Sequence, residues 1–138
     1  MDIKRLICPL VSKLVFEDKG HQQIGIKKTI LITGGKMTKA LTLARAFHAA
    51  GHRVILAETA RYSSTGHRFS FAVNKFYTVP YPQDPNYTKA LLTIIEKESV
   101  DEYVPVCSPV ASYFDSYAIP FLEPFCRVVH VEPNKIVD

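Results

Sequence analysis

The chain has 138 residues, 47% of them hydrophobic and 22% charged, which is the composition of a globular domain and not of a disordered or collagen-like chain. A chain of this length buries roughly two thirds of its surface on folding, enough for a single core, which excludes a complete two-lobed enzyme. Seventeen Lys and Arg stand against thirteen Asp and Glu, giving a formal charge of +4. The basic residues are scattered, so we expect a solvated surface and no nucleic-acid partner.

Residues 1–26 are predicted to form an N-terminal extension that leads into a folded domain over residues 27–138. Apolar pairs recur every four residues at 6–7, 10–11 and 14–15. This spacing is compatible with an amphipathic helix, which we expect on the domain's own surface in preference to a membrane surface. Lys13 interrupts the apolar stretch before it reaches the ~18 residues of a membrane span, so no membrane-spanning segment is expected. Residues 17–28 are polar and indicate a linker.

The three cysteines, Cys8, Cys107 and Cys126, are odd in number and far apart in the sequence. They contain no C-x-x-C pair of the kind that binds zinc or performs redox chemistry. Reduced thiols in a cytoplasmic protein fit this pattern best, and no metal site is expected.

From Lys28 onward, short apolar runs rich in β-branched residues alternate with stretches of helical period. The runs predict strands within residues 29–35, 52–59, 75–80, 102–107 and 127–133, and the periodic stretches predict helices within residues 36–51, 86–100 and 110–118. Such alternation indicates βαβ units, whose right-handed crossovers give an open parallel sheet. The sequence therefore predicts an α/β, Rossmann-like domain of about five strands in the order 3-2-1-4-5, with helices on both faces.

Some element ends are predicted from single residues. Asp84 is expected to be the N-cap of the second predicted helix, the one that covers residues 86–100, with Pro85 at its first position. Pro105 is expected to cause a bulge or leave an N–H unpaired in the fourth strand, and Pro120 is expected to end the last helix. Residues 61–75 are predicted to form a loop and a short helix. The side chains that face inward from this helix are Phe69, Ala72 and Val73.

The first strand ends in Gly34, Gly35 and Lys36, directly before a helix. Paired glycines let the backbone approach an anion, and a helix start offers N–H groups and a positive dipole end. These residues are therefore candidates for anion or substrate binding. The stretch lacks the third glycine of G-x-G-x-x-G and is not a P-loop, so a tight turn that binds nothing is an equally supported interpretation.

Two further strand ends carry candidate residues. Glu58 follows Gly34 by 24 residues, near the place where dinucleotide-binding folds put a ribose-binding acid, although a solvated strand-end acid fits equally well. Arg61 follows in a polar loop that can lie over the same cleft. Cys107 and Ser108 place a thiol and a hydroxyl at a helix start, with simple N-capping the favoured role of Ser108. No self-sufficient catalytic set is present, so no catalytic residue is assigned.

The chain contains the stretches GGKMTKAL, AGHRVILAE, RFSFAVNKFY and VPVCSPVAS in this order. Their combination resembles the N-terminal segment of a family of ATP-grasp proteins of cyanobacteria, fungi and algae. The family includes relatives of the ligase that joins an amino acid to a cyclohexenone in mycosporine synthesis. The similarity covers residues 28–132.

The resemblance implies a pre-ATP-grasp domain, which packs against nucleotide-binding lobes and helps to shape a substrate cleft. By position, residues 34–36 match the family's first turn, Glu58 its second strand end, and residues 107–109 the loop after its fourth strand. ATP and Mg²⁺ are implied for the whole family, held by lobes further along the chain. The sequence departs from the family pattern because it stops at Asp138, before those lobes, so no cofactor is expected in this chain.

The leading hypothesis is the substrate-side domain of an ATP-dependent carboxylate–amine ligase that is inactive alone. Its expected partners are ATP-grasp lobes of the same or a longer chain and a small-molecule substrate. The alternative is a free-standing Rossmann-type module that binds a nucleotide or a protein. An enzyme with Cys107 as its nucleophile is the least favoured hypothesis, since the sequence places no histidine near it.

Overall fold

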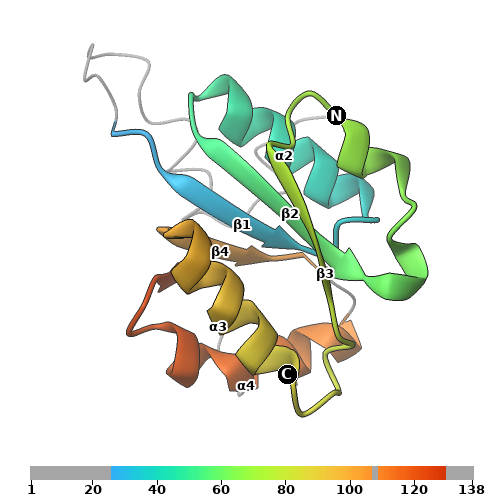
Figure 1. The fold of residues 1–138 in the computed structure, drawn as a ribbon, viewed down its shortest axis with the longest axis vertical. Helices are drawn as coiled ribbons and strands as arrows, with labels where there is room; N and C mark the ends of the chain where they lie inside the picture. Colours follow the sequence, from blue (N-terminus) through green and yellow to red (C-terminus); the bar gives the residue numbers. More distant parts are fainter. Residues whose placement is uncertain (1–25, 107–108, 130–138) are drawn as a thin grey trace.

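The computed structural model describes residues 26–106 and 109–129, which form a five-stranded sheet with all strands parallel (Figure 1). The strands are β1 Thr29–Thr33, β2 Arg53–Thr59, β3 Lys75–Val79, β4 Glu102–Pro105 and β5 Arg127–Val128. Their order is β3-β2-β1-β4-β5, which confirms the predicted topology with β1 at the centre. Residues 1–25 of the predicted extension over residues 1–26 and the end of the predicted fifth strand lie outside the described residues.

Helices cover both faces of the sheet, as predicted (Figure 1). α2 Thr38–Ala49 lies on one face, and α3 Tyr87–Glu98 and α4 Pro109–Leu122 lie on the other. Two 3₁₀ turns, η2 Ala60–Tyr62 and η3 Gly66–Phe69, lie between β2 and β3. In the described part of the chain, no helix combines the length and the apolar character needed to cross a membrane.

The core has two layers because the central strands are apolar on both faces. Ile30 and Ile32 of β1 lie in one core cluster with Phe47 of α2, whereas Leu31 lies in the opposite cluster with Leu91 of α3. These five side chains are 0–1% exposed. Successive side chains of a strand alternate between its faces, so an uninterrupted apolar run suits a strand that is covered twice. This buried frame holds the strand ends in fixed positions.

The segment between β2 and β3 differs from its prediction. The expected short helix is only the single turn η3, after which the backbone at Ser70 is extended, with φ −62° and ψ 140°. The side-chain orientations expected for a helix therefore do not apply to this segment. Phe69, expected to face inward, is 78% exposed, whereas Ala72 is buried and Val73 packs against the core as predicted.

The start of α3 also differs from its prediction. The helix begins at Tyr87 with Asn86 at the N-cap position, so Asp84 is not its N-cap. The Asp84 carboxylate instead accepts the N–H of Asn86 at 2.8 Å, and its carbonyl accepts the N–H of Tyr87 at 3.0 Å. Asp84 and Pro85 thus form a turn that precedes the helix.

The two prolines have milder effects than expected. Pro120 lies inside α4, which continues to Leu122, so the last turn lacks the one intrahelical hydrogen bond that this residue's N–H would make. Pro105 is the last residue of β4, and β5 pairs only with Glu102 and Tyr103. The register of β4 with β1 is continuous through Pro105, so the strand needs no bulge there.

Candidate functional site

A pocket of about 300 Å³ lies at the carboxyl ends of β1, β2 and β3. Thr33 and Gly34 line it from the end of β1, and Glu58 lines it from the end of β2. Lys36 and Tyr87 complete its polar wall, and the first turns of α4 reach it as well. In open parallel sheets this edge is where ligands bind. The pocket is therefore the candidate functional site.

The turn between β1 and α2 requires glycine at two positions. Gly34 has φ 73°, a conformation that side chains rarely adopt. A Cβ on Gly35 would lie 2.9 Å from Cγ of Leu56 and 3.1 Å from the carbonyl oxygen of Ala57. The Gly35 N–H donates to that same carbonyl at 3.0 Å. The turn thus packs directly on β2, which brings α2 and Lys36 to the pocket.

Glu58 fastens this turn to the end of β2. It is 5% exposed. Its Oε2 accepts the N–H of Lys36 at 3.0 Å, and its Oε1 accepts the N–H and the hydroxyl of Thr59 at 2.7 and 3.1 Å. A carboxylate has about four acceptor positions, so three donors leave little of Glu58 for a ligand.

The backbone of the turn has little left to offer an anion. The N–H groups of Gly35 and Lys36 are held by Ala57 and Glu58, and the N–H of Met37 donates to the Gly34 carbonyl at 2.9 Å. A phosphate at these N–H groups would have to displace the Glu58 carboxylate. The described arrangement therefore favours recognition by side chains over a phosphate cradle built from the backbone.

Two cations lie against one aromatic ring beside the pocket. The Lys36 ammonium is 3.4 Å from the ring centroid of Tyr62, and the Arg61 guanidinium is 5.5 Å from it. Cations are attracted to the face of such a ring. Lys36 and Tyr62 line the pocket, whereas Arg61 lies next to it. The entrance therefore carries positive charge and suits a negatively charged group of a ligand.

A buried polar network that the sequence did not reveal lies behind the pocket. Asp115 of α4 is 1% exposed, and its Oδ1 accepts the hydroxyls of Tyr87 at 2.6 Å and Tyr103 at 3.2 Å. The Thr33 hydroxyl lies 3.1 Å from that of Tyr103. Burial, with the nearby Tyr87 and Asp115, raises the pKa of Tyr103 well above its usual value, so its hydroxyl stays protonated. Thr33 and Tyr87 connect this network to the pocket.

The structure brings most of the predicted site residues together. Gly34, Lys36 and Glu58 line one pocket, Gly35 lies in the same turn, and Arg61 lies beside it. Cys107 and Ser108 lie outside the described residues, so their predicted roles stay predictions. In residues 26–106 and 109–129, no three His, Cys, Asp or Glu side chains gather as a metal site would require.

Cys126 is a buried free thiol at the opposite end of α4. Burial raises the pKa of this thiol to about 11, and the carboxylates of Glu102 and Asp101 add to the shift. A protonated thiol is a poor nucleophile. Cys126 is therefore a structural residue and not a reactive one.

Comparisons with known proteins give likeness of fold. No protein-family model matches the chain, and no curated protein matches it in sequence. Among solved structures, the biotin carboxylase domain of a thermophilic 2-oxoglutarate carboxylase bound to bicarbonate matches with a TM-score of 0.57 and 12% identity. The same domain of Hydrogenobacter thermophilus 2-oxoglutarate carboxylase, in a complex with MgADP, ADP and bicarbonate, matches with a TM-score of 0.58 and 11% identity.

Each of these matches covers 80% of this chain and 24% of the biotin carboxylase chain. The chain thus spans about a quarter of the length of these structural relatives. At this identity the likeness shows the fold alone. The described residues have the parallel α/β fold of one part of a biotin carboxylase domain.

Proposed function

We propose that the chain is the substrate-side domain of an ATP-dependent carboxylate–amine ligase of the ATP-grasp type. The observation that carries the proposal is the pocket at the carboxyl ends of β1, β2 and β3, with a cation at its entrance and a polar network behind it. The fold likeness to biotin carboxylase domains supports the same superfamily.

The pocket suits a small substrate with a carboxylate and a hydroxyl group. The Lys36 ammonium supplies a charge for the carboxylate, and the hydroxyl oxygen of Thr33 can accept a hydrogen bond from a substrate hydroxyl. Its volume of about 300 Å³ lies at the small end of ligand pockets, which fits an amino acid or a single small ring. A ligase of the mycosporine type, which joins an amino acid to a ring, is the specific form of the proposal.

We place ATP and Mg²⁺ outside the described residues. Three N–H groups of the glycine turn already have acceptors, and the described part of the chain contains no cluster of metal ligands. ATP would activate a carboxylate as an acyl phosphate on lobes that this domain packs against. The residues of this chain would bind the substrate and orient it. The same observations oppose the alternative of a free-standing nucleotide-binding module.

Amide chemical shifts measured by NMR test substrate binding directly. Titration with a panel of amino acids and small hydroxylated ring carboxylates is expected to shift the amides of Gly34, Lys36 and Thr59 first. Lys36→Ala should weaken the strongest binder by about tenfold, because it removes the charge at the entrance. Lys39→Ala, which removes an exposed charge from the first turn of α2, should leave the affinity unchanged. Shifts centred elsewhere, or none, would contradict the proposal.

Calorimetric titration with MgATP separates the proposal from its alternative. We expect no binding tighter than ~10 μM, which corresponds to ~6.8 kcal/mol, and no ATP hydrolysis by this chain. Tighter binding would mean that a complete nucleotide site exists here, and it would favour the nucleotide-binding module.

A further inference from the structure

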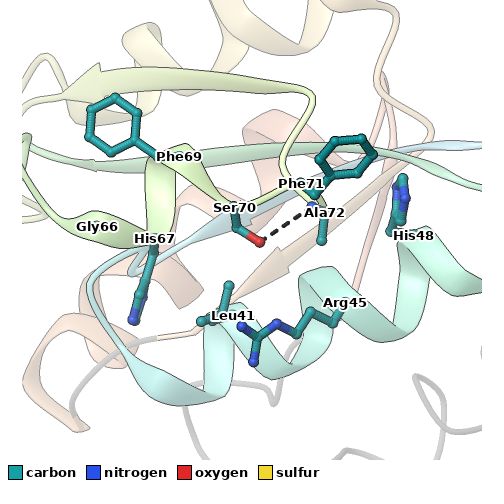
Figure 2. A pocket seen from close by; sticks show the side chains of 9 residues that line it. All are labelled: Leu41, Arg45, His48, Gly66, His67, Phe69, Ser70, Phe71 and Ala72. Atoms are coloured by element: carbon teal, nitrogen blue, oxygen red, sulfur yellow. Dashed lines mark hydrogen bonds between the residues drawn. The ribbon is translucent and has the colours of Figure 1, made fainter.

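A second hollow lies away from the strand ends, on the flank of α2 (Figure 2). It is a groove of about 500 Å³ between this helix and residues 66–72. Leu41, Arg45 and His48 line it from α2, as Figure 2 shows, and residues of η3 and the following extended segment line the other side. None of the pocket residues at the strand ends lines this groove, so the proposed substrate site does not account for it.

The groove is bordered by two phenylalanines that the core does not cover. Phe69 is 78% exposed and Phe71 is 95% exposed. The Phe71 ring stands edge-on to the ring of His48, with centroids 6.5 Å apart and planes at 84°. Large apolar side chains that project together beside a hollow mark an interaction surface. A protein partner would cover more of both rings than a small molecule inside the groove.

The lining of the groove carries the positive charge of Arg45. His48 and His67 also line it, and no Asp or Glu does. The Nδ1 of His67 lies 2.9 Å from the carbonyl oxygen of Gly35, which can only accept, so this nitrogen carries the proton and the ring is held in place. Arg68 adds a further cation next to the groove, 5.5 Å from the Phe69 ring. A partner must therefore be acidic where it meets these residues.

We propose that this groove docks an acidic segment of a partner protein that also carries a large apolar side chain. The apolar side chain would pack against the apolar lining residues Leu41 and Phe71, and an Asp or Glu residue would pair with Arg45. A second copy of this chain fits poorly, because a twofold contact centred on the groove would bring the Arg45 guanidinium of one copy near that of the other. The proposal goes beyond the substrate site and does not depend on it.

Selection from a random library of displayed twelve-residue peptides on the immobilised full chain tests the proposal. The enriched peptides are expected to have a net negative charge and at least one large apolar residue. The most enriched peptide, synthesised and titrated by fluorescence anisotropy, should bind Arg45→Glu at least about tenfold more weakly than the unchanged chain. Phe71→Ser should weaken binding by a similar factor.

Matched variants distinguish binding in the groove from nonspecific effects of net charge and of exposed apolar side chains. Lys39→Glu makes the same change of charge on the same helix, and Phe125→Ser removes an exposed phenylalanine elsewhere, and both should bind the peptide within about twofold of the unchanged chain. Circular dichroism should show that all four variants are folded, since each changed side chain is exposed. Enrichment of neutral or basic peptides, the absence of enrichment, or equal binding by Arg45→Glu would overturn the proposal. So would a dimer in gel filtration that Arg45→Glu dissociates, since the groove would then hold a second copy.

Discussion

At the amino ends of the strands, carboxylates are neutralised by side-chain cations. Glu98 accepts hydrogen bonds from Arg53 at 2.7 Å, from Lys75 at 2.6 Å and from the hydroxyl of Tyr77. Glu102, with a side chain 3% exposed, accepts one from Lys28 at 3.1 Å and lies 3.9 Å from Arg127. These ion pairs stabilise the sheet, and Oε2 of Glu102 stays buried without a hydrogen-bond partner.

At the carboxyl ends, buried carboxylates are instead held by neutral donors. Glu58 is held by N–H and hydroxyl groups of Lys36 and Thr59, and Asp115 by the hydroxyls of Tyr87 and Tyr103. The Lys36 ammonium lies over the Tyr62 ring at the pocket entrance and not on a carboxylate. At the amino ends of the strands the charges pair with one another and stabilise the sheet. At the carboxyl ends a cation lies beside a pocket, and this edge is suited to a ligand.

Asp115→Leu is expected to have the largest effect on stability. It removes the buried carboxylate that accepts hydrogen bonds from the hydroxyls of Tyr87 and Tyr103, so we expect the free energy of unfolding to fall by about 3 kcal/mol. Asp115→Asn keeps an acceptor oxygen and should cost about 1 kcal/mol. Urea denaturation followed by circular dichroism measures both values. Equal stability of the Leu variant and the unchanged chain would show that the network does not support the carboxyl edge.

Gly35→Ala is expected to have the next largest effect. The added Cβ would lie 2.9 Å from Leu56 and 3.1 Å from the Ala57 carbonyl, and relief requires the turn to move off β2. We expect a loss of about 2 kcal/mol, the usual scale for overpacking. Gly66→Ala is the control, because its Cβ would meet nothing within 4 Å, and it should lie within about 0.5 kcal/mol of the unchanged chain. Similar losses for both would show that close packing is not the reason for Gly35.

The strands around the turn between β1 and α2 were predictable from the sequence, because the signals for these strands are local and repeated. Continuous apolar runs such as residues 54–57 identify doubly covered strands, and chain order then places Gly34 and Glu58 at one edge. What Glu58 does there was not predictable. Its contact with the Lys36 N–H depends on how the turn packs on β2, and residue types do not encode that distance.

The missed residues depend on packing between distant elements. An acid within a helix is usually exposed, so Asp115 carried no signal, and its tyrosine partners lie 28 and 12 residues away in the sequence. Phe69 was misplaced because helical period was applied where the chain leaves a 3₁₀ turn for extended backbone. The basic groove beside α2 follows from that same segment, so it could not be foreseen either.

Glu98→Gln tests the stabilising edge through pH. Hydrogen bonds from Lys75, Tyr77 and Arg53 lower the pKa of Glu98 to about 2 from its usual 4.5. A lowered pKa contributes stability that is present above pH 4.5 and is lost as pH falls toward 2. The unchanged chain should therefore lose stability over this window more steeply than Glu98→Gln. At neutral pH the variant should be less stable by about 1 kcal/mol.

Urea denaturation at a series of pH values measures this difference. Glu96→Gln on the same helix is the control, because Glu96 is exposed, and its pH profile should follow that of the unchanged chain. Parallel profiles for Glu98→Gln and the unchanged chain would show that the cluster of cations does not stabilise the amino edge.

Lys36→Ala is expected to have the smallest effect on stability, and this is what distinguishes the two edges. Its ammonium meets the face of Tyr62 at an accessible position, where such a contact is worth about 0.5 kcal/mol. A double-mutant cycle with Tyr62→Leu should give a coupling energy of that size. If Lys36→Ala instead costs as much as Glu98→Gln, then Lys36 is a stabilising residue like the cations of the amino edge, and the contrast between the edges fails. A small loss of stability combined with a tenfold loss of carboxylate binding would show that Lys36 acts on the ligand. If Lys36 acted only by stabilising the fold, its removal would weaken binding only by lowering stability as well.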